Sequence, residues 1–101
     1  MPKRVLVING PNLNMLGIRE PKVYGSQTLR DIEAMCIAEG KRLGLAVECR
    51  QTNREGEICE WIQQAYGKQD AIVLNPGGYS HTSVAIRDAI SAVGIPTWKC
   101  I

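Results

Sequence analysis

The chain has 101 residues, of which 45% are apolar and 5% aromatic, so it can form one hydrophobic core but not two. Its formal net charge is only +2, and no run of basic residues is longer than Lys3-Arg4, which argues against a nucleic-acid or membrane-surface partner. We therefore expect a single domain over residues 1–101 whose partner is a small molecule.

The cysteines and the single histidine, His81, do not form a metal-binding pattern. The four cysteines include no C-x-x-C pair, so we expect no structural zinc and no metal cofactor. No apolar run approaches the length of a membrane span, and the few apolar residues after Lys3 and Arg4 are too short for a secretory signal. These features predict a cytoplasmic protein with reduced thiols.

A short apolar run, Val5 to Ile8, predicts a buried strand, and a long polar connection rich in Gly, Pro and Asn follows it. Compact domains rarely keep such a loop without a use for it. The loop carries one arginine, Arg19, and one tyrosine, Tyr24.

A helix is predicted from Thr28 to Leu43, where Thr28 and Asp31 resemble a capping box and Gly44 ends the helix. Leu29, Ile32, Cys36 and Leu43 are expected to lie on one face of this helix. Residues 45–50 alternate between apolar and polar, which is typical of a half-buried strand at the edge of a sheet.

Ile58, Trp61, Ile62 and Ala65 have helical spacing, and this helix ends near Gly67, with Glu55 and Glu57 as acids of its first turn. The wholly apolar run from Ala71 to Leu74 predicts a strand covered on both faces.

A second polar loop, Asn75 to Ser83, leads into a helix from Val84 to Val93, which Gly94 ends. The residues of this helix expected to face the sheet are Val84, Ala85, Ala89, Ile90 and Val93. A last strand should start near Ile95-Pro96.

Strands that alternate with amphipathic helices predict an α/β fold, a doubly wound parallel sheet with right-handed crossovers. In the flavodoxin-like order 2-1-3-4, the first and third strands are neighbours, and ligands bind beyond their carboxyl ends. The two polar loops leave those ends, so we expect the site between them.

The two loops offer neutral hydrogen-bond donors and one fixed cation. The candidate groups are the amides of Asn9, Asn12 and Asn75, the backbone near Gly77 and Gly78, and the side chains of Arg19, Tyr24, Ser80 and His81. This set suits a polyhydroxylated ligand with a carboxylate. Phosphate-binding patterns such as G-x-G-x-x-G are absent, which disfavours a nucleotide or phospho-receiver module.

A tyrosine, whose pKa is ordinarily about 10, becomes a usable base when a guanidinium lies close to it. Arg19 and Tyr24 could form that pair on one loop. The alternatives are ordinary: Tyr24 as a packing or turn residue, Arg19 as a solvated charge, His81 as a capping residue, and the asparagines as turn residues.

Three segments carry a resemblance to a known family. "NGPNLNMLGIREPKVYG", "QTNREGEICEWI" and "NPGGYSHTSVAIRDAI" resemble the type II 3-dehydroquinate dehydratases, or type II dehydroquinases, and the likeness runs from about Val5 to Thr97. It implies a lyase of the shikimate pathway and aromatic amino acid biosynthesis that dehydrates 3-dehydroquinate to 3-dehydroshikimate without a cofactor. It also implies a homododecamer, a tetramer of trimers, and leaves open a role in quinate breakdown.

The resemblance implies an anti elimination through an enolate. Tyr24 would be the base, Arg19 would stabilise its phenolate, and Asn12 would hold the water that stabilises the enolate. The implied substrate-binding residues are Asn75, Gly77, Gly78 and His81, together with Asp88, which would reach the site of a neighbouring subunit. The loop after the first strand would then act as a lid.

The sequence departs mildly from the family at Met15, Arg54 and Gly78, and strongly at its end. The family continues V-E-V-H-L-S after the isoleucine-proline pair, and its histidine is the general acid; Ile101 stands at that position here. We expect a truncated chain without the fifth strand and last helix. One hypothesis is a single-base deletion in the gene. Such a deletion would turn codons for V-E-V-H-L-S into codons for Trp-Lys-Cys-Ile followed by a stop. The neighbouring reading frame of the gene tests this hypothesis.

Two functions follow from these observations. The first is a type II dehydroquinase. The second is a catalytically impaired remnant that only binds substrate-like carboxylic acids or assembles with complete subunits, since loss of a general acid costs roughly 10²–10⁴-fold in rate.

Overall fold

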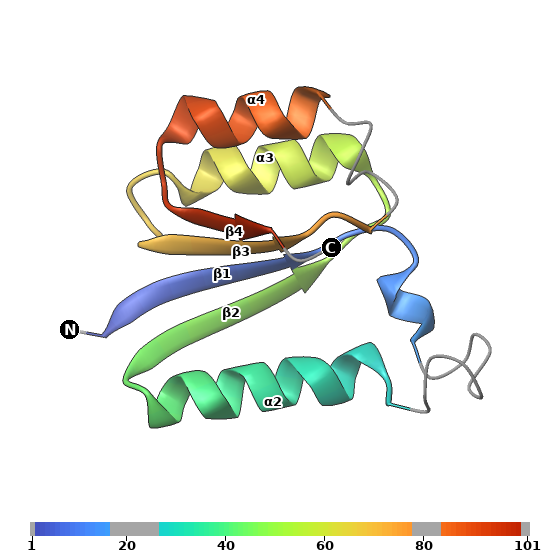
Figure 1. The fold of residues 1–101 in the computed structure, drawn as a ribbon, viewed down its shortest axis with the longest axis vertical. Helices are drawn as coiled ribbons and strands as arrows, with labels where there is room; N and C mark the ends of the chain where they lie inside the picture. The colour runs from blue at the N-terminus through green and yellow to red at the C-terminus, as the bar shows by residue number, and fades with distance from the viewer. Residues whose placement is uncertain (1, 17–26, 78–83, 100–101) are drawn as a thin grey trace.

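The computed structural model describes residues 2–16, 27–77 and 84–99 (Figure 1). They form three layers, in which α3 (Glu55–Ala65) and α4 (Val84–Val93) cover one face of a sheet and α2 (Leu29–Arg42) lies on the other. The remaining described elements are β1 (Lys3–Asn9), the 3-10 helix η1 (Leu13–Met15), β2 (Leu45–Gln51), β3 (Ala71–Asn75) and β4 (Thr97–Lys99).

The described strands are parallel and lie in the order β2-β1-β3-β4, which confirms the predicted fold class and strand order. β2 forms an edge of this sheet, and its Leu45, Val47 and Cys49 are half-buried while the residues between them are exposed. The alternation in the sequence therefore identified this edge strand correctly.

The last strand begins at Thr97, directly after the Ile95-Pro96 pair near which it was predicted to start. Proline has no N–H to donate, but the carbonyl of Pro96 accepts a hydrogen bond from the Ile72 N–H at 3.0 Å. Pro96 thus joins β4 to β3 from just outside the strand.

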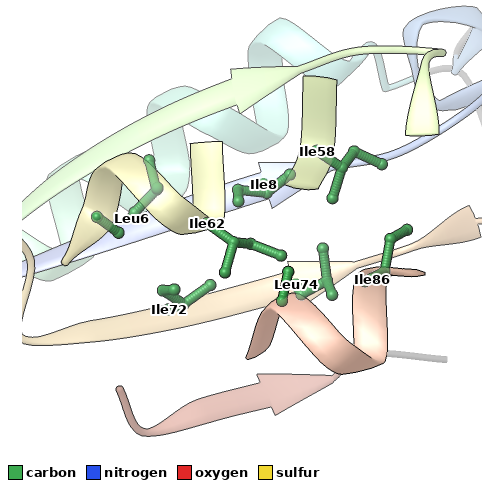
Figure 2. Close-up of a cluster of buried hydrophobic side chains, with 9 residues drawn as sticks. Leu6, Ile8, Ile58, Ile62, Ile72, Leu74 and Ile86 are labelled. Atoms are coloured by element: carbon green, nitrogen blue, oxygen red, sulfur yellow. The ribbon is translucent and has the colours of Figure 1, made fainter. Parts of the chain in front are cut away.

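The core lies between the sheet and the pair α3 and α4 (Figure 2). Alternate residues of β1 and β3 point into it, because successive side chains of a strand face opposite sides of the sheet. Ile58 and Ile62 of α3 are fully buried against them, as their helical spacing predicted. The buried apolar residues of this cluster are Leu6, Ile8, Ile58, Ile62, Ala65, Ile72, Leu74, Ile86 and Ala89.

Helix α2 begins with the predicted capping box. The Asp31 N–H donates to Thr28 Oγ1 at 3.2 Å, and the Thr28 N–H donates to Asp31 Oδ2 at 3.0 Å. Leu43 does not share a buried helical face with Leu29, as was predicted, since it follows the last helical residue and is 59% exposed. Gly40 instead forms the close contact, because a Cβ there would stand 2.3 Å from Cγ2 of Val47.

The bounds of α4 are as predicted, but its buried face is rotated. Val84 is 66% exposed and Ala85 is also exposed, whereas Ile86 is 3% exposed. Ala89 is buried as expected, and Ile90 and Val93 are half-buried against the core. The run of apolar residues allowed both orientations, and packing on α3 decided between them.

Candidate active site

The carboxyl ends of three neighbouring strands meet at one edge of the sheet. Asn9, the last residue of β1, is in register with Gln51 of β2 on one side and with Asn75 of β3 on the other. The loops that follow these residues therefore start side by side, as the strand order predicted.

The loops after β1 and β3 touch through their backbones. Gly10 N–H donates to the carbonyl oxygen of Asn75 at 2.7 Å, and a Cβ on Gly10 would stand 2.7 Å from the carbonyl oxygen of Pro76. Gly77 has φ +57, and a Cβ there would stand 2.7 Å from the carbonyl oxygen of Pro11. Only glycine allows this mutual approach, so Gly77 has a structural role in joining the loops.

Asn75 bends the second loop with its own side chain. The Gly77 N–H donates to Asn75 Oδ1 at 3.3 Å, the geometry of an Asx turn. This supports the ordinary reading of Asn75 as a turn residue. The turn uses the side-chain oxygen of Asn75 and not its NH₂ group, so the NH₂ group can donate hydrogen bonds to a ligand.

Asn12 stands at the N-terminus of η1 and has φ 68, the one positive φ of a non-glycine residue in the described ranges. Its backbone N–H donates to Oδ1 of Asn53 at 3.0 Å. That contact occupies no atom of the Asn12 carboxamide. The side chain that the sequence singled out is thus anchored through its backbone.

The turn after β2 is tied to the start of α3. Thr52 is 5% exposed, its N–H donates to the Asn9 carbonyl at 3.0 Å, and its Oγ1 accepts from the Arg54 N–H at 3.1 Å. The Thr52 hydroxyl donates to a carboxylate oxygen of Glu57. This hydrogen bond, with a smaller effect of the Arg54 charge, lowers the pKa of Glu57 from its ordinary 4.5, while burial opposes the shift.

The described residues bring together some of the predicted site and not all of it. Asn12, Asn75 and Gly77 lie on the two loops that meet at the sheet edge. Asp88 is exposed on α4. The predicted residues Arg19, Tyr24, Gly78, Ser80 and His81 lie outside the described residues.

Two residues of this edge were not predicted from the sequence, Gln51 and Asn53. Both belong to the segment after β2, which drew attention only as part of the family resemblance. The signal for them was available, because the carboxyl end of β2 lies beside that of β1 in the predicted strand order.

A separate cavity of about 100 Å³ lies between β2 and α3, lined by Leu6, Glu48, Arg50, Trp61, Gln64, Ala65, Lys68 and Gln69. It contains none of the predicted site residues. One of its two cations, Arg50, stacks 5.5 Å from the Trp61 ring centre and pairs with Glu48 at 2.7 Å. These contacts stabilise the sheet edge and identify no ligand.

Among the described residues, no group of histidine, cysteine and acidic side chains is arranged to hold a metal ion. None of the helices in that part of the chain has the length and apolar character needed to span a bilayer.

Comparison with known proteins extends the likeness over nearly the whole chain. The family model described as dehydroquinase class II matches residues 3–100. The chain is 54% identical over 100 residues to a 3-dehydroquinate dehydratase of Phenylobacterium zucineum, covering 99% of this chain and 69% of that one. It is 59% identical over 96 residues to a catabolic 3-dehydroquinase 1 of Aspergillus terreus, covering 95% and 63%.

Among solved structures, the type II dehydroquinase from Propionibacterium acnes superposes with a TM-score of 0.90 at 44% identity, covering 98% of this chain and 68% of that chain. The chain thus spans 63% to 69% of the length of these relatives. The family match and the shared fold lead to one conclusion: this chain belongs to the class II dehydroquinase family.

Proposed function

We propose that the chain acts on 3-dehydroquinate, removing water to give 3-dehydroshikimate by an anti elimination through an enolate. The family match over residues 3–100 carries this proposal. The meeting of the loops after β1 and β3 at the sheet edge supports it, because the two segments with the predicted chemistry start there. No metal or cofactor is needed for this chemistry, since the ketone itself stabilises the carbanion as an enolate.

The first step breaks a C–H bond next to the ketone. The phenolate of Tyr24 takes the proton, the electron pair moves to the ketone oxygen, and Arg19 stabilises the phenolate. Asn12 holds the water that donates a hydrogen bond to the enolate oxygen.

The substrate is held by the second loop. Asn75 offers its amide NH₂ group, and Gly77 and Gly78 offer backbone N–H groups to hydroxyls and the carboxylate, with His81 as a further donor. Asp88 reaches a neighbouring subunit's site in the homododecamer that the resemblance implies. Its exposed position on α4 is compatible with such a contact.

The second step releases the hydroxyl group and requires a proton. The resemblance assigns that proton to a histidine, and isoleucine stands at the corresponding position, Ile101. An isoleucine side chain has no proton to donate. We expect the rate of this step, rather than of the first, to differ from that of family members that carry the histidine.

The test follows the two steps separately. The exchange of the proton next to the ketone is measured by NMR of 3-dehydroquinate in D₂O, and water loss is measured by the absorbance of the conjugated enone. The chain is compared with Tyr24→Phe and with the matched control Tyr66→Phe, whose ring is 71% exposed outside the site. We expect exchange with the native chain and Tyr66→Phe and none with Tyr24→Phe.

Enone formation at a Tyr24-dependent rate completes the case for a dehydratase. If the chain exchanges the α-proton but forms no enone, the second candidate function replaces the dehydratase: an impaired chain that retains the base and has lost the acid step. The absence of exchange, or exchange that survives Tyr24→Phe, would refute the proposal.

The composition of the chain also supports a proposal for its cellular setting. We propose a cytoplasmic protein that forms one domain and has a small-molecule partner, with neither nucleic acid nor membrane as a ligand. The free thiols of Cys36, Cys49 and Cys59 support a reducing compartment, and the low net charge of +2 supports a small partner.

A further inference from the structure

The backbone conformation of Asn12 needs support from elsewhere in the chain. A residue with a Cβ is disfavoured at φ 68, by roughly 1–2 kcal/mol relative to the right-handed region. Asparagine tolerates this region better than most residues, but it does not enforce it. The hydrogen bond from the Asn12 N–H to Asn53 Oδ1, at 3.0 Å, fixes the residue at the point of strain.

Gln51 fixes the same turn from both sides. Its Nε2 lies 3.2 Å from the carbonyl oxygen of Gly10 and 3.4 Å from Oδ1 of Asn14, so it contacts the chain before and after Asn12. It also lies 3.1 Å from Asn53 Oδ1, the atom that accepts from Asn12. One amide group therefore links the entry to the turn, its exit and its anchor.

Asn53 is itself held by a rigid support. The residues on either side of it, Thr52 and Arg54, are joined by the hydrogen bond from the Arg54 N–H to Thr52 Oγ1. Thr52 is buried and is bonded to β1 through the Asn9 carbonyl and to α3 through Glu57. The anchor thus transmits the geometry of the sheet and of α3 to the Asn12 turn.

We propose that Gln51 and Asn53 are positioning residues that hold the left-handed turn at Asn12 and so fix the direction of its carboxamide. They act on the backbone of Asn12 and leave the atoms of its side chain to the substrate and its water. The catalytic consequence rests on the proposed function, since it assumes that Asn12 assists enolate formation. The geometric part of the proposal, that Gln51 and Asn53 hold the turn at Asn12, does not depend on the proposed function.

The test uses two substitutions at one position. Asn53→Ala removes the acceptor, whereas Asn53→Asp keeps an oxygen that can accept from Asn12 and Gln51. The matched control is Gln63→Ala, which removes an exposed amide side chain on α3 outside this network. For each variant, hydrogen exchange of the Asn12 amide, the kcat and KM of α-proton exchange, and the urea midpoint are measured.

We expect Asn53→Ala to lower the protection of the Asn12 amide at least tenfold and to lower kcat for α-proton exchange by about 10- to 100-fold with little change in KM, because a misplaced group loses orientation rather than binding. Asn53→Asp should restore both. Gln63→Ala should leave the amide protection of Asn12 and kcat near the native values.

A folded Asn53→Ala chain with native kcat would overturn the catalytic role, and one with native amide protection would overturn the anchor itself. If Asn53→Ala and Asn53→Asp lose the same amide protection and the same kcat, the anchor is also contradicted. In that case the side-chain oxygen that Asp retains would make no difference. If the native chain shows no α-proton exchange, the proposed function fails, and the amide protection of Asn12 still decides whether Asn53 holds the turn.

Discussion

The backbone N–H of Gly10 donates a hydrogen bond to the carbonyl oxygen of Asn75 at 2.7 Å. The first residue of the loop after β1 is therefore joined to the last residue of β3, where the second loop begins. This contact makes the sheet edge a fixed base for both loops.

Gly10→Ala should destabilise the protein by about 1–3 kcal/mol, as other overpacked sites do. The new Cβ would stand 2.7 Å from the Pro76 carbonyl oxygen, and a backbone atom cannot move aside as a flexible side chain can. Urea unfolding measures the loss. In the matched control Gly56→Ala the new Cβ meets nothing within 4 Å, and it should stabilise α3 by up to about 1 kcal/mol. Equal midpoints for Gly10→Ala and the native chain would show that the loops can separate freely.

The rotated face of α4 is tested by two truncations on the same helix. Ile86→Ala should cost about 2–5 kcal/mol, because Ile86 is 3% exposed and its removal leaves a cavity against α3. Val84→Ala should change the free energy of unfolding by less than about 0.5 kcal/mol, because Val84 is 66% exposed. If Val84→Ala destabilises the protein more than Ile86→Ala does, the orientation of α4 first predicted from the sequence is the correct one.

Acid should weaken the support of the Asn53 turn through Glu57. Its folded pKa is lowered, mainly by the hydrogen bond from Thr52, so the carboxylate form is favoured in the folded chain. The stability it contributes is fully present above the ordinary pKa of 4.5 and is lost as the pH falls through the lowered folded pKa. Urea midpoints measured between about pH 7 and pH 3 should fall less steeply in Glu57→Gln than in the native chain.

The comparison with Glu57→Gln is needed because the pKa values of Asp31 and Glu39 are also lowered, by hydrogen bonds from Thr28 and Arg42 respectively. Those two groups remain in the variant, so only the difference between the two pH profiles reports on Glu57. Identical profiles would mean that the Thr52 contact does not favour the carboxylate.

Cys49 should be an unreactive thiol in the folded chain. Burial, with smaller effects from nearby Glu33, Cys36 and Glu48, raises its pKa from 9.0 to about 11. A two-unit rise reduces the thiolate fraction near pH 8 by roughly 100-fold, and the thiolate is the form that reacts. Peptide mapping after iodoacetamide treatment should find slow labelling of Cys49 in buffer and fast labelling in urea. Equal rates in both would contradict the burial of this thiol.

The sequence by itself determined the order of helices and strands, the family, and the local signals within each element. The capping box of Thr28 and Asp31 was readable because its partners are three residues apart, and β2 was readable because a strand alternates its side chains between two faces. The predicted order of strands was that of the flavodoxin-like fold, and it brought Asn9 and Asn75 to the same edge.

Only the tertiary structure decided which face of α4 is buried and which residue supports Asn12. Val84 and Ile86 are both apolar, so their pattern could not separate them, and packing on the core chose Ile86. Asn53 lies 41 positions from Asn12 along the chain, and their contact depends on strand register and on two turns at once. Local patterns carry no information about such contacts, because their geometry exists only when the distant segments have come together.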